Sequence, residues 1–202
     1  MMKRNIGILF FLLLVTQVSA QTDSRFDRFM KTLSDSCVFM NVEYVSGSFK
    51  GNSEICVQDK MYSMTGNGIE AICDGNTVCL KDDVAKEVVY EPVAETGGMS
   101  FLLNPALLFN DFEERFRFAK VEVESGVGRY ELESKCECGI DKCTLWLDRD
   151  GKLVKAMFII DGGNEMNVSV SEFKAGAKAS PAAFALPDPD GFGKDWIITD
   201  LR

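Results

Sequence analysis

The apolar positions near the start of the chain repeat with the period of a helix. Phe26, Phe29, Met30, Leu33 and Cys37 fall at positions i, i+3, i+4, i+7 and i+11. Side chains at these spacings share one helical face. The pattern therefore predicts one amphipathic helix, with short polar stretches at both of its ends.

From Val38 onward the apolar period changes to two, which is the period of a strand. Val38, Met40, Val42 and Tyr44 alternate with the residues between them. Turn signals built from Gly, Asn and Asp then recur at short intervals, with β-rich runs between them. This spacing predicts an antiparallel meander rather than alternating strands and helices. The strands expected after the first are residues 54–64, 69–73, 78–80, 87–91, 115–124, 129–134, 144–147, 153–160 and 167–173.

Two further features concern how this sheet is covered. Residues 99–112 form a short insert that is apolar on nearly all sides, so it needs cover from several directions. Several strands are apolar on both faces, as in residues 154–160, which indicates packing on each side of the sheet. A closed or half-closed barrel with helices in its mouth satisfies both observations. The stretch from Lys174 onward is rich in Ala, Gly and Pro up to Trp196, which predicts a loop across the body and one last short strand.

The start of the chain has the pattern of a secretory signal peptide. Lys3 and Arg4 precede an almost unbroken apolar run at 6–15, and small residues at 18–20 fit a cleavage site. A spanning helix needs about twenty apolar residues, so an uncleaved membrane anchor is the weaker alternative. We therefore expect residues 1–20 to be a signal peptide and residues 21–202 to form a single exported domain.

Charge and residue types exclude several classes of function. The chain has 22 Lys and Arg against 31 Asp and Glu, a net charge of −9, so it has no basic excess to neutralise nucleic-acid phosphates. It contains no His, so it can build no Ser-His-Asp triad, Cys-His dyad or His-containing metal site. The sequence also shows no nucleophilic residue close to a residue that could act as its general base. We expect a protein that is not an enzyme and that uses no cofactor.

Short segments along nearly the whole mature chain carry a family resemblance. They are VSGSF at 45–49, GIEAICDGNT at 68–77, KEVV at 86–89, NPALL at 104–108, LDRDGKL at 147–153, VSVSEF at 168–173, FALP at 184–187 and ITDLR at 198–202. In this order, and within the elements predicted above, they resemble the periplasmic lipoprotein carriers of the LolA-like family.

The resemblance implies a fold that is mainly β with helices (α+β). A strongly curved antiparallel half-barrel would be covered by the N-terminal helix and the short apolar helical insert, leaving an apolar cavity for the acyl chains of a lipoprotein. An acyl chain in water costs about 0.8 kcal/mol per methylene, so a carrier needs a dry pocket, and Met and Phe suit its lining. The alternative is that these side chains simply form the core. The candidate lining residues are Met61, Met64, Leu102, Leu108, Phe109, Phe112, Phe116, Phe118, Met157 and Phe158.

Two segments depart from the family pattern: residues 78–81 lack an aromatic pair that members often carry after the 74–75 turn, and residues 57–61 lack an Arg. The well-studied carriers have an Arg in the strand region before the 68–77 hairpin, and this Arg latches the helical lid, whereas residues 57–61 contain none. Gln58 and Lys60 are the candidates to replace it by donating hydrogen bonds to lid carbonyls. Lys lacks the planar fork of Arg and is more strongly hydrated, so a surface position for Lys60 is the alternative.

The function that the resemblance implies is a periplasmic chaperone that carries lipoproteins from the inner to the outer membrane. Its expected partners are acylated lipoproteins, an inner-membrane lipoprotein-releasing complex and an outer-membrane acceptor, with no nucleic acid, and the carrier itself is expected to be a monomer. The alternative is a periplasmic sensor or binding protein for lipids or lipoproteins that regulates an envelope partner.

The seven cysteines leave several possibilities open. An exported compartment permits disulfides, and an odd number leaves at least one thiol over. Cys73 and Cys79 flank one tight turn, and Cys138 and Cys143 flank another, so each pair could form a disulfide if the strand register allows it. Buried free thiols, thiol chemistry and a metal site at residues 136–143 are the alternatives, although that spacing is not a standard zinc pattern.

Overall fold

The computed structural model describes residues 24–93, 112–135, 139–160 and 162–202. The predicted signal peptide and nearly all of the predicted apolar insert therefore lie outside the described residues. No helix in the described ranges is long and apolar enough to cross a membrane. The elements are α1 (Ser24–Asp35), β1 (Cys37–Ser46), β2 (Phe49–Gln58), β3 (Met61–Gly66), β4 (Ile69–Cys73), β5 (Thr77–Asp82), β6 (Glu87–Pro92), α4 (Phe112–Arg115), β7 (Phe116–Glu124), β8 (Val127–Ser134), β9 (Ile140–Leu147), β10 (Leu153–Ile160), β11 (Asn164–Gly176), η2 (Pro181–Phe184), η3 (Pro189–Gly191) and β12 (Ile197–Asp200).

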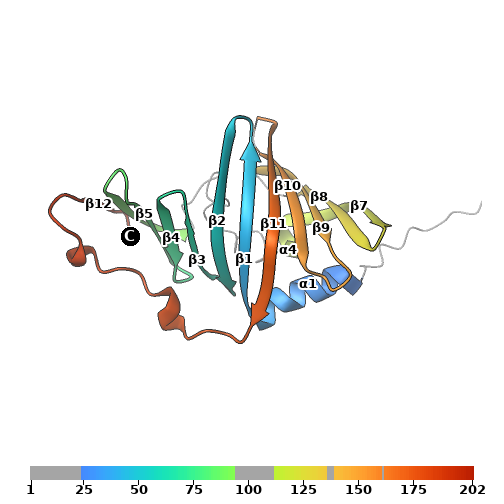
Figure 1. Cartoon of the computed structure of the whole chain (residues 1–202), viewed down its shortest axis with the longest axis horizontal. Coiled ribbons are helices and arrows are strands. Elements are labelled where there is room, and N and C mark those ends of the chain that lie inside the picture. The colour runs from blue at the N-terminus through green and yellow to red at the C-terminus, as the bar shows by residue number, and fades with distance from the viewer. Residues whose placement is uncertain (1–23, 94–111, 136–138, 161) are drawn as a thin grey trace, which may run out of the picture.

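The strands form one curved sheet. It has 12 strands in the order β12-β6-β5-β4-β3-β2-β1-β11-β10-β9-β8-β7. Neighbouring strands are antiparallel, except that β12 runs parallel to β6. Figure 1 shows the long strands β1, β2 and β11 in the middle of the sheet and shorter strands on either side. The prediction of a mainly β fold built on an antiparallel half-barrel is confirmed.

One predicted strand is interrupted by a turn. The sequence predicts a continuous strand at 54–64, but β2 ends at Gln58 and β3 begins at Met61. Asp59 lies between them with φ of 51°, in the left-handed region. Asp is one of the few residues other than Gly that adopts this conformation as a single residue, so the chain turns without a Gly or Pro to signal it.

Strand alternation gives the sheet two chemically different faces. In β1, Val38, Met40 and Val42 are buried, the residues between them are half-buried, and Glu43 and Val45 further along are exposed. We call the face that carries Val38, Met40 and Val42 the inner face, and the opposite one the outer face. One core cluster extends over the inner face from β5 through the middle of the sheet to β7. Because successive side chains in a strand point to opposite sides, the register assigns every strand residue to one of these faces.

Helix α1 packs on the inner face. Phe26 and Phe29 are buried in the inner-face cluster. The Phe26 ring lies 4.9 Å from the ring of Phe118, edge to face, and the Phe29 ring lies 6.4 Å from that of Phe173. Burying one such side chain stabilises a fold by about 1.5–3 kcal/mol. The predicted amphipathic helix is confirmed, except that it ends at Asp35 and Cys37 belongs to β1.

The segment after β11, residues 177–196, crosses the outer face toward the far edge of the sheet (Figure 1). We call this segment the C-terminal arm. It contacts β3 through η2, and Phe184 in η2 is buried. The arm then leads into β12, which pairs with β6. The predicted loop across the body and last short strand are therefore confirmed.

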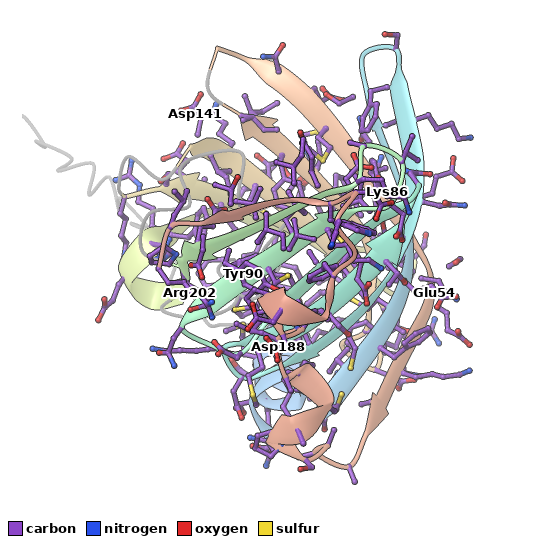
Figure 2. The ribbon with its side chains drawn as sticks, turned by 90° about the vertical axis from the view of Figure 1, so that its left-hand side faces the viewer. Glu54, Lys86, Tyr90, Asp141, Asp188 and Arg202 are labelled. Carbon is purple, nitrogen blue, oxygen red and sulfur yellow. The ribbon has the colours of Figure 1, made fainter. Side chains whose placement is uncertain are left out.

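The arm covers a second apolar cluster. On the outer face of β5 and β6, Cys79, Val88 and Tyr90 are buried under side chains of the arm. The Tyr90 hydroxyl donates a hydrogen bond to the carbonyl of Pro187 at 2.9 Å. Figure 2 shows Tyr90 beside Arg202, whose guanidinium lies 4.6 Å from the centre of the Tyr90 ring. The sheet is thus packed on both sides, by α1 on the inner face and by the arm on the outer face.

Candidate functional site

The inner face is the candidate site, because it gathers apolar side chains from both halves of the curved sheet. Four of the predicted lining residues lie on it: Met64, Phe116, Phe118 and Phe158. Met64 comes from β3, whereas the three Phe residues come from β7 and β10, so the curvature brings distant strands into one cluster. Met64, Phe116 and Phe158 are buried, and Phe118 is half-buried.

Two other predicted lining residues lie on the wrong side of the sheet. Met61 precedes Tyr62, which faces inward opposite Val57, and Met157 lies between the inward-facing Ala156 and Phe158. Alternation therefore places Met61 and Met157 on the outer face, where they cannot line an inner-face cavity.

The remaining predicted lining residues belong to the apolar insert. Leu102, Leu108 and Phe109 lie outside the described residues. Phe112 begins the short helix α4, but the position of its side chain is not among the described features.

The inner face also contains apolar residues that the sequence reasoning missed. Val121 pairs with the inward-facing Tyr130, and Val123 pairs with Gly128, so both valines face inward on the edge strand β7. They are 38% and 52% exposed. Large apolar side chains therefore continue beyond the closed core onto an accessible part of the same face. The signal was present in the sequence as the alternation of valines with charged residues through 120–124.

The hydroxyl of Tyr62 is buried within this apolar face. Tyr62 is fully buried, and its hydroxyl has no hydrogen-bond partner among the described residues. Burial raises the pKa of Tyr62 above its ordinary value, with smaller contributions from Cys73 and Glu91. A buried hydroxyl without a partner is costly, so a carbonyl group that reached it would gain a hydrogen bond at little further desolvation cost.

The predicted lid-latch residues do not act on the inner face. Gln58 is buried at the end of β2, and both polar atoms of its side chain are bonded to the backbone of Ala179 in the C-terminal arm. Lys60 is exposed in the turn between β2 and β3. Gln58 follows the inward-facing Val57, so it lies on the outer face, where it holds the arm and is turned away from an inner lid.

Strand register also decides the first predicted disulfide. Cys73 pairs with Val78, and Cys79 pairs with Ile72, so the two thiols point to opposite faces of the sheet. A bond between Cys73 and Cys79 is therefore ruled out in this register. Cys138 lies outside the described residues. Cys143 is buried on the inner face, where burial raises its thiol pKa above the ordinary range.

The outer face differs in chemistry from the inner one. A trough of about 720 Å³ crosses β11, β1, β2 and β3, and polar side chains such as Asn41, Glu43, Glu54 and Ser171 line most of it. Figure 2 shows Glu54 pointing away from the body of the domain on this side. Within the described ranges, no group of three or more His, Cys, Asp or Glu side chains could hold a metal ion. The trough thus offers a polar surface to a partner, and the inner face an apolar one.

Comparisons with known proteins bear on the fold. No family model and no curated protein matches the sequence. The structure is similar to that of an uncharacterised conserved protein from Thermus thermophilus, with a TM-score of 0.54 and 13% identity over 88% of this chain and 97% of that one. This likeness shows a shared fold across almost the full length of the Thermus protein.

Two further solved structures have lower scores. MucB matches with a TM-score of 0.47 and 15% identity over 84% of this chain and 64% of that one. A LolA superfamily protein from Nitrosomonas europaea matches with a TM-score of 0.44 and 10% identity over 81% of this chain and 96% of that one.

Proposed function

We propose that this chain is a periplasmic binding protein rather than an enzyme, and that it holds the acyl chains of lipoproteins on its inner face. The observation that carries the proposal is the apolar surface that extends from the buried core to the accessible Val121 and Val123. Apolar side chains left accessible on a concave surface are typical of a binding site for an apolar ligand.

The free energy of acyl burial is large enough for this role. Each methylene removed from water contributes about 0.8 kcal/mol, so ten methylenes contribute about 8 kcal/mol. A bound ester or amide carbonyl would also give the Tyr62 hydroxyl a hydrogen-bond partner. The carrier would receive acylated lipoproteins from an inner-membrane releasing complex and deliver them to an outer-membrane acceptor.

The experiment compares one substitution on each face. Val121 faces inward and Val45 faces outward, and both are 38% exposed. Val121→Asp places a charge on the proposed binding face, whereas Val45→Asp places the same charge on the outer face at equal exposure. Each variant and the unaltered chain are titrated with a lipopeptide bearing two palmitoyl chains, and with the same peptide without them.

We expect the unaltered chain and Val45→Asp to bind the acylated peptide but not the unacylated one. Val121→Asp should weaken binding of the acylated peptide at least tenfold, which corresponds to about 1.4 kcal/mol. Far-ultraviolet circular dichroism checks that all three chains keep the sheet. Equal binding of the acylated and unacylated peptides, or an equal loss in the two variants, would overturn the proposal.

The polar trough favours a second candidate, a sensor that reports bound lipid to an envelope protein. Glu54 in the trough, and Glu43 in competition with its exposed ion pair to Lys50, would attract a basic segment of that partner, and the attraction would weaken as salt screens it. The sensor would be favoured if a partner binds only when acylated ligand is present, and if the double variant Glu43→Gln/Glu54→Gln no longer binds that partner. Delivery of ligand to acceptor membranes by that double variant at the normal rate would favour the carrier.

A further inference from the structure

Two cysteine thiols meet on the outer face of the sheet. Cys37 is the first residue of β1, and Cys56 lies near the end of β2, directly opposite Phe39. The two cysteines are therefore diagonal neighbours across one antiparallel pair. Their sulfur atoms are 2.7 Å apart, and both residues are half-buried.

The geometry requires little movement to join them. The two sulfurs of a disulfide are about 2.05 Å apart, so the atoms need to approach by less than about 1 Å. Burial and the neighbouring Cys37 thiol raise the pKa of Cys56 to about 12, so Cys56 keeps its proton at neutral pH.

We propose that Cys37 and Cys56 are an oxidation site at which an intramolecular disulfide forms. One of the two cysteines, as the thiolate, attacks one sulfur of a small disulfide such as oxidised glutathione, and one glutathione thiolate leaves. The other cysteine then loses its proton to solvent and attacks the first cysteine's sulfur. The second glutathione leaves as a thiolate, and both released thiolates take up protons. Two electrons and two protons pass from the cysteines to the oxidant, which is reduced to two thiols.

The disulfide would lie between the attachment points of α1 and of the C-terminal arm, the two segments that cover the sheet. Cys37 lies two residues after Asp35, the last residue of α1, which packs on the inner face. Cys56 is two residues before Gln58, which holds the C-terminal arm on the outer face. The bond would fix the start of β1 to the end of β2 between these two attachments. The proposal concerns the thiols alone and is independent of whether the inner face binds acyl chains.

The experiment maps the bond in the folded, full chain. The protein is incubated with oxidised or reduced glutathione in native buffer, quenched with acid, unfolded, labelled with N-ethylmaleimide and digested with trypsin. Cleavage after Lys31, Lys50 and Lys60 separates Cys37 and Cys56 into peptides 32–50 and 51–60, each with one cysteine. The expected product of oxidation is these two peptides joined, and reductant should separate them.

Two variants complete the test. Cys56→Ser should leave Cys37 joined to no other cysteine after oxidation, either free or as its mixed disulfide with glutathione. Cys79→Ser, which alters a buried outer-face thiol under the arm, should retain the linked peptides. Reduction should lower the melting temperature of the oxidised unaltered chain by several degrees and leave that of Cys56→Ser unchanged. Full labelling of both cysteines after oxidation of the unaltered chain, or linkage of Cys37 to another cysteine, would overturn the proposal.

Discussion

The side chain of Gln58 pairs with the backbone of Ala179 as a neighbouring strand would. Its Nε2 donates to the Ala179 carbonyl at 3.0 Å, and its Oε1 accepts from the Ala179 N–H at 2.7 Å. These residues are 121 positions apart in the chain. Gln58 is only 3% exposed, so water does not compete for either bond. One amide thus fixes the beginning of the C-terminal arm to the end of β2.

Gln58→Ala should release the first part of the arm. It removes both hydrogen bonds and leaves the backbone of Ala179 unpaired, which should lower the free energy of unfolding by about 1–3 kcal/mol. Labelling of the Cys79 thiol, which lies under the arm, should become faster because the arm opens more often. The matched control is Lys60→Ala, two residues further on and exposed, which should change neither measurement. An equal effect of the two substitutions would contradict the role assigned to Gln58.

Tyr62→Phe should stabilise the free protein and weaken ligand binding. It removes a buried hydroxyl that has no hydrogen-bond partner among the described residues, so the free energy of unfolding should rise by about 1 kcal/mol. Tyr90→Phe is the control with the opposite sign, because its hydroxyl donates to Pro187 at 2.9 Å. That variant should lose about 1 kcal/mol in the same denaturant titration. A destabilised Tyr62→Phe would show that the hydroxyl has a partner in the folded protein.

Phe29→Ala should detach α1 from the inner face. Phe29 is fully buried, and truncation of a buried Phe costs about 3–5 kcal/mol. Hydrogen exchange in α1 should accelerate more than exchange in β1, because the helix is held to the sheet chiefly by its apolar face. Asp27→Ala on the exposed side of the same helix should have little effect on either quantity. Unchanged exchange in α1 would mean that other contacts hold the helix.

Stability should fall in alkali partly because of Cys73. Burial is the main cause that raises its pKa to about 11 from 9.0. A raised pKa means that the folded state favours the neutral thiol. The contribution of Cys73 to the free energy of unfolding is therefore constant below about pH 9 and is lost as the pH rises toward 11. Two pKa units correspond to about 3 kcal/mol. Denaturant titrations in reductant should show Cys73→Ala losing that much less stability than the unaltered chain between about pH 8 and pH 11. Parallel pH profiles would contradict the assignment.

The sequence predicted the faces of the sheet where the alternation was unbroken. The run from Val38 to Tyr44 separates inward from outward residues, and the structure follows it. Residue type alone suggests a cavity lining for Met61 and Met157, whereas alternation with their neighbours Tyr62 and Ala156 gives the opposite face. Counting by twos from those neighbours would have placed both methionines on the outer face.

Other parts of the site depend on long-range geometry that no local pattern encodes. The pairing of Gln58 with Ala179 joins segments whose approach is set by the path of the arm, and a buried Gln looks like any strand residue in the sequence. The meeting of Cys37 and Cys56 had a usable signal, because the turn between β1 and β2 sets which residues lie opposite. The turn at Asp59 has no Gly or Pro to signal it, and after it the inward-facing residues change from odd to even numbers. The alternation in β2 therefore does not predict the faces of β3.

The two outermost strands also decide how the protein behaves when it is concentrated. β12 is only four residues long and is exposed along its length, and β7 carries a bulge between Phe118 and Lys120 and the charged pair Lys120 and Glu122. Short, bulged and charged strands resist pairing with another chain. Long, flat edge strands would allow other chains to pair with both edges of the sheet. The two edge strands of this protein should therefore limit aggregation while its apolar inner face is without a ligand.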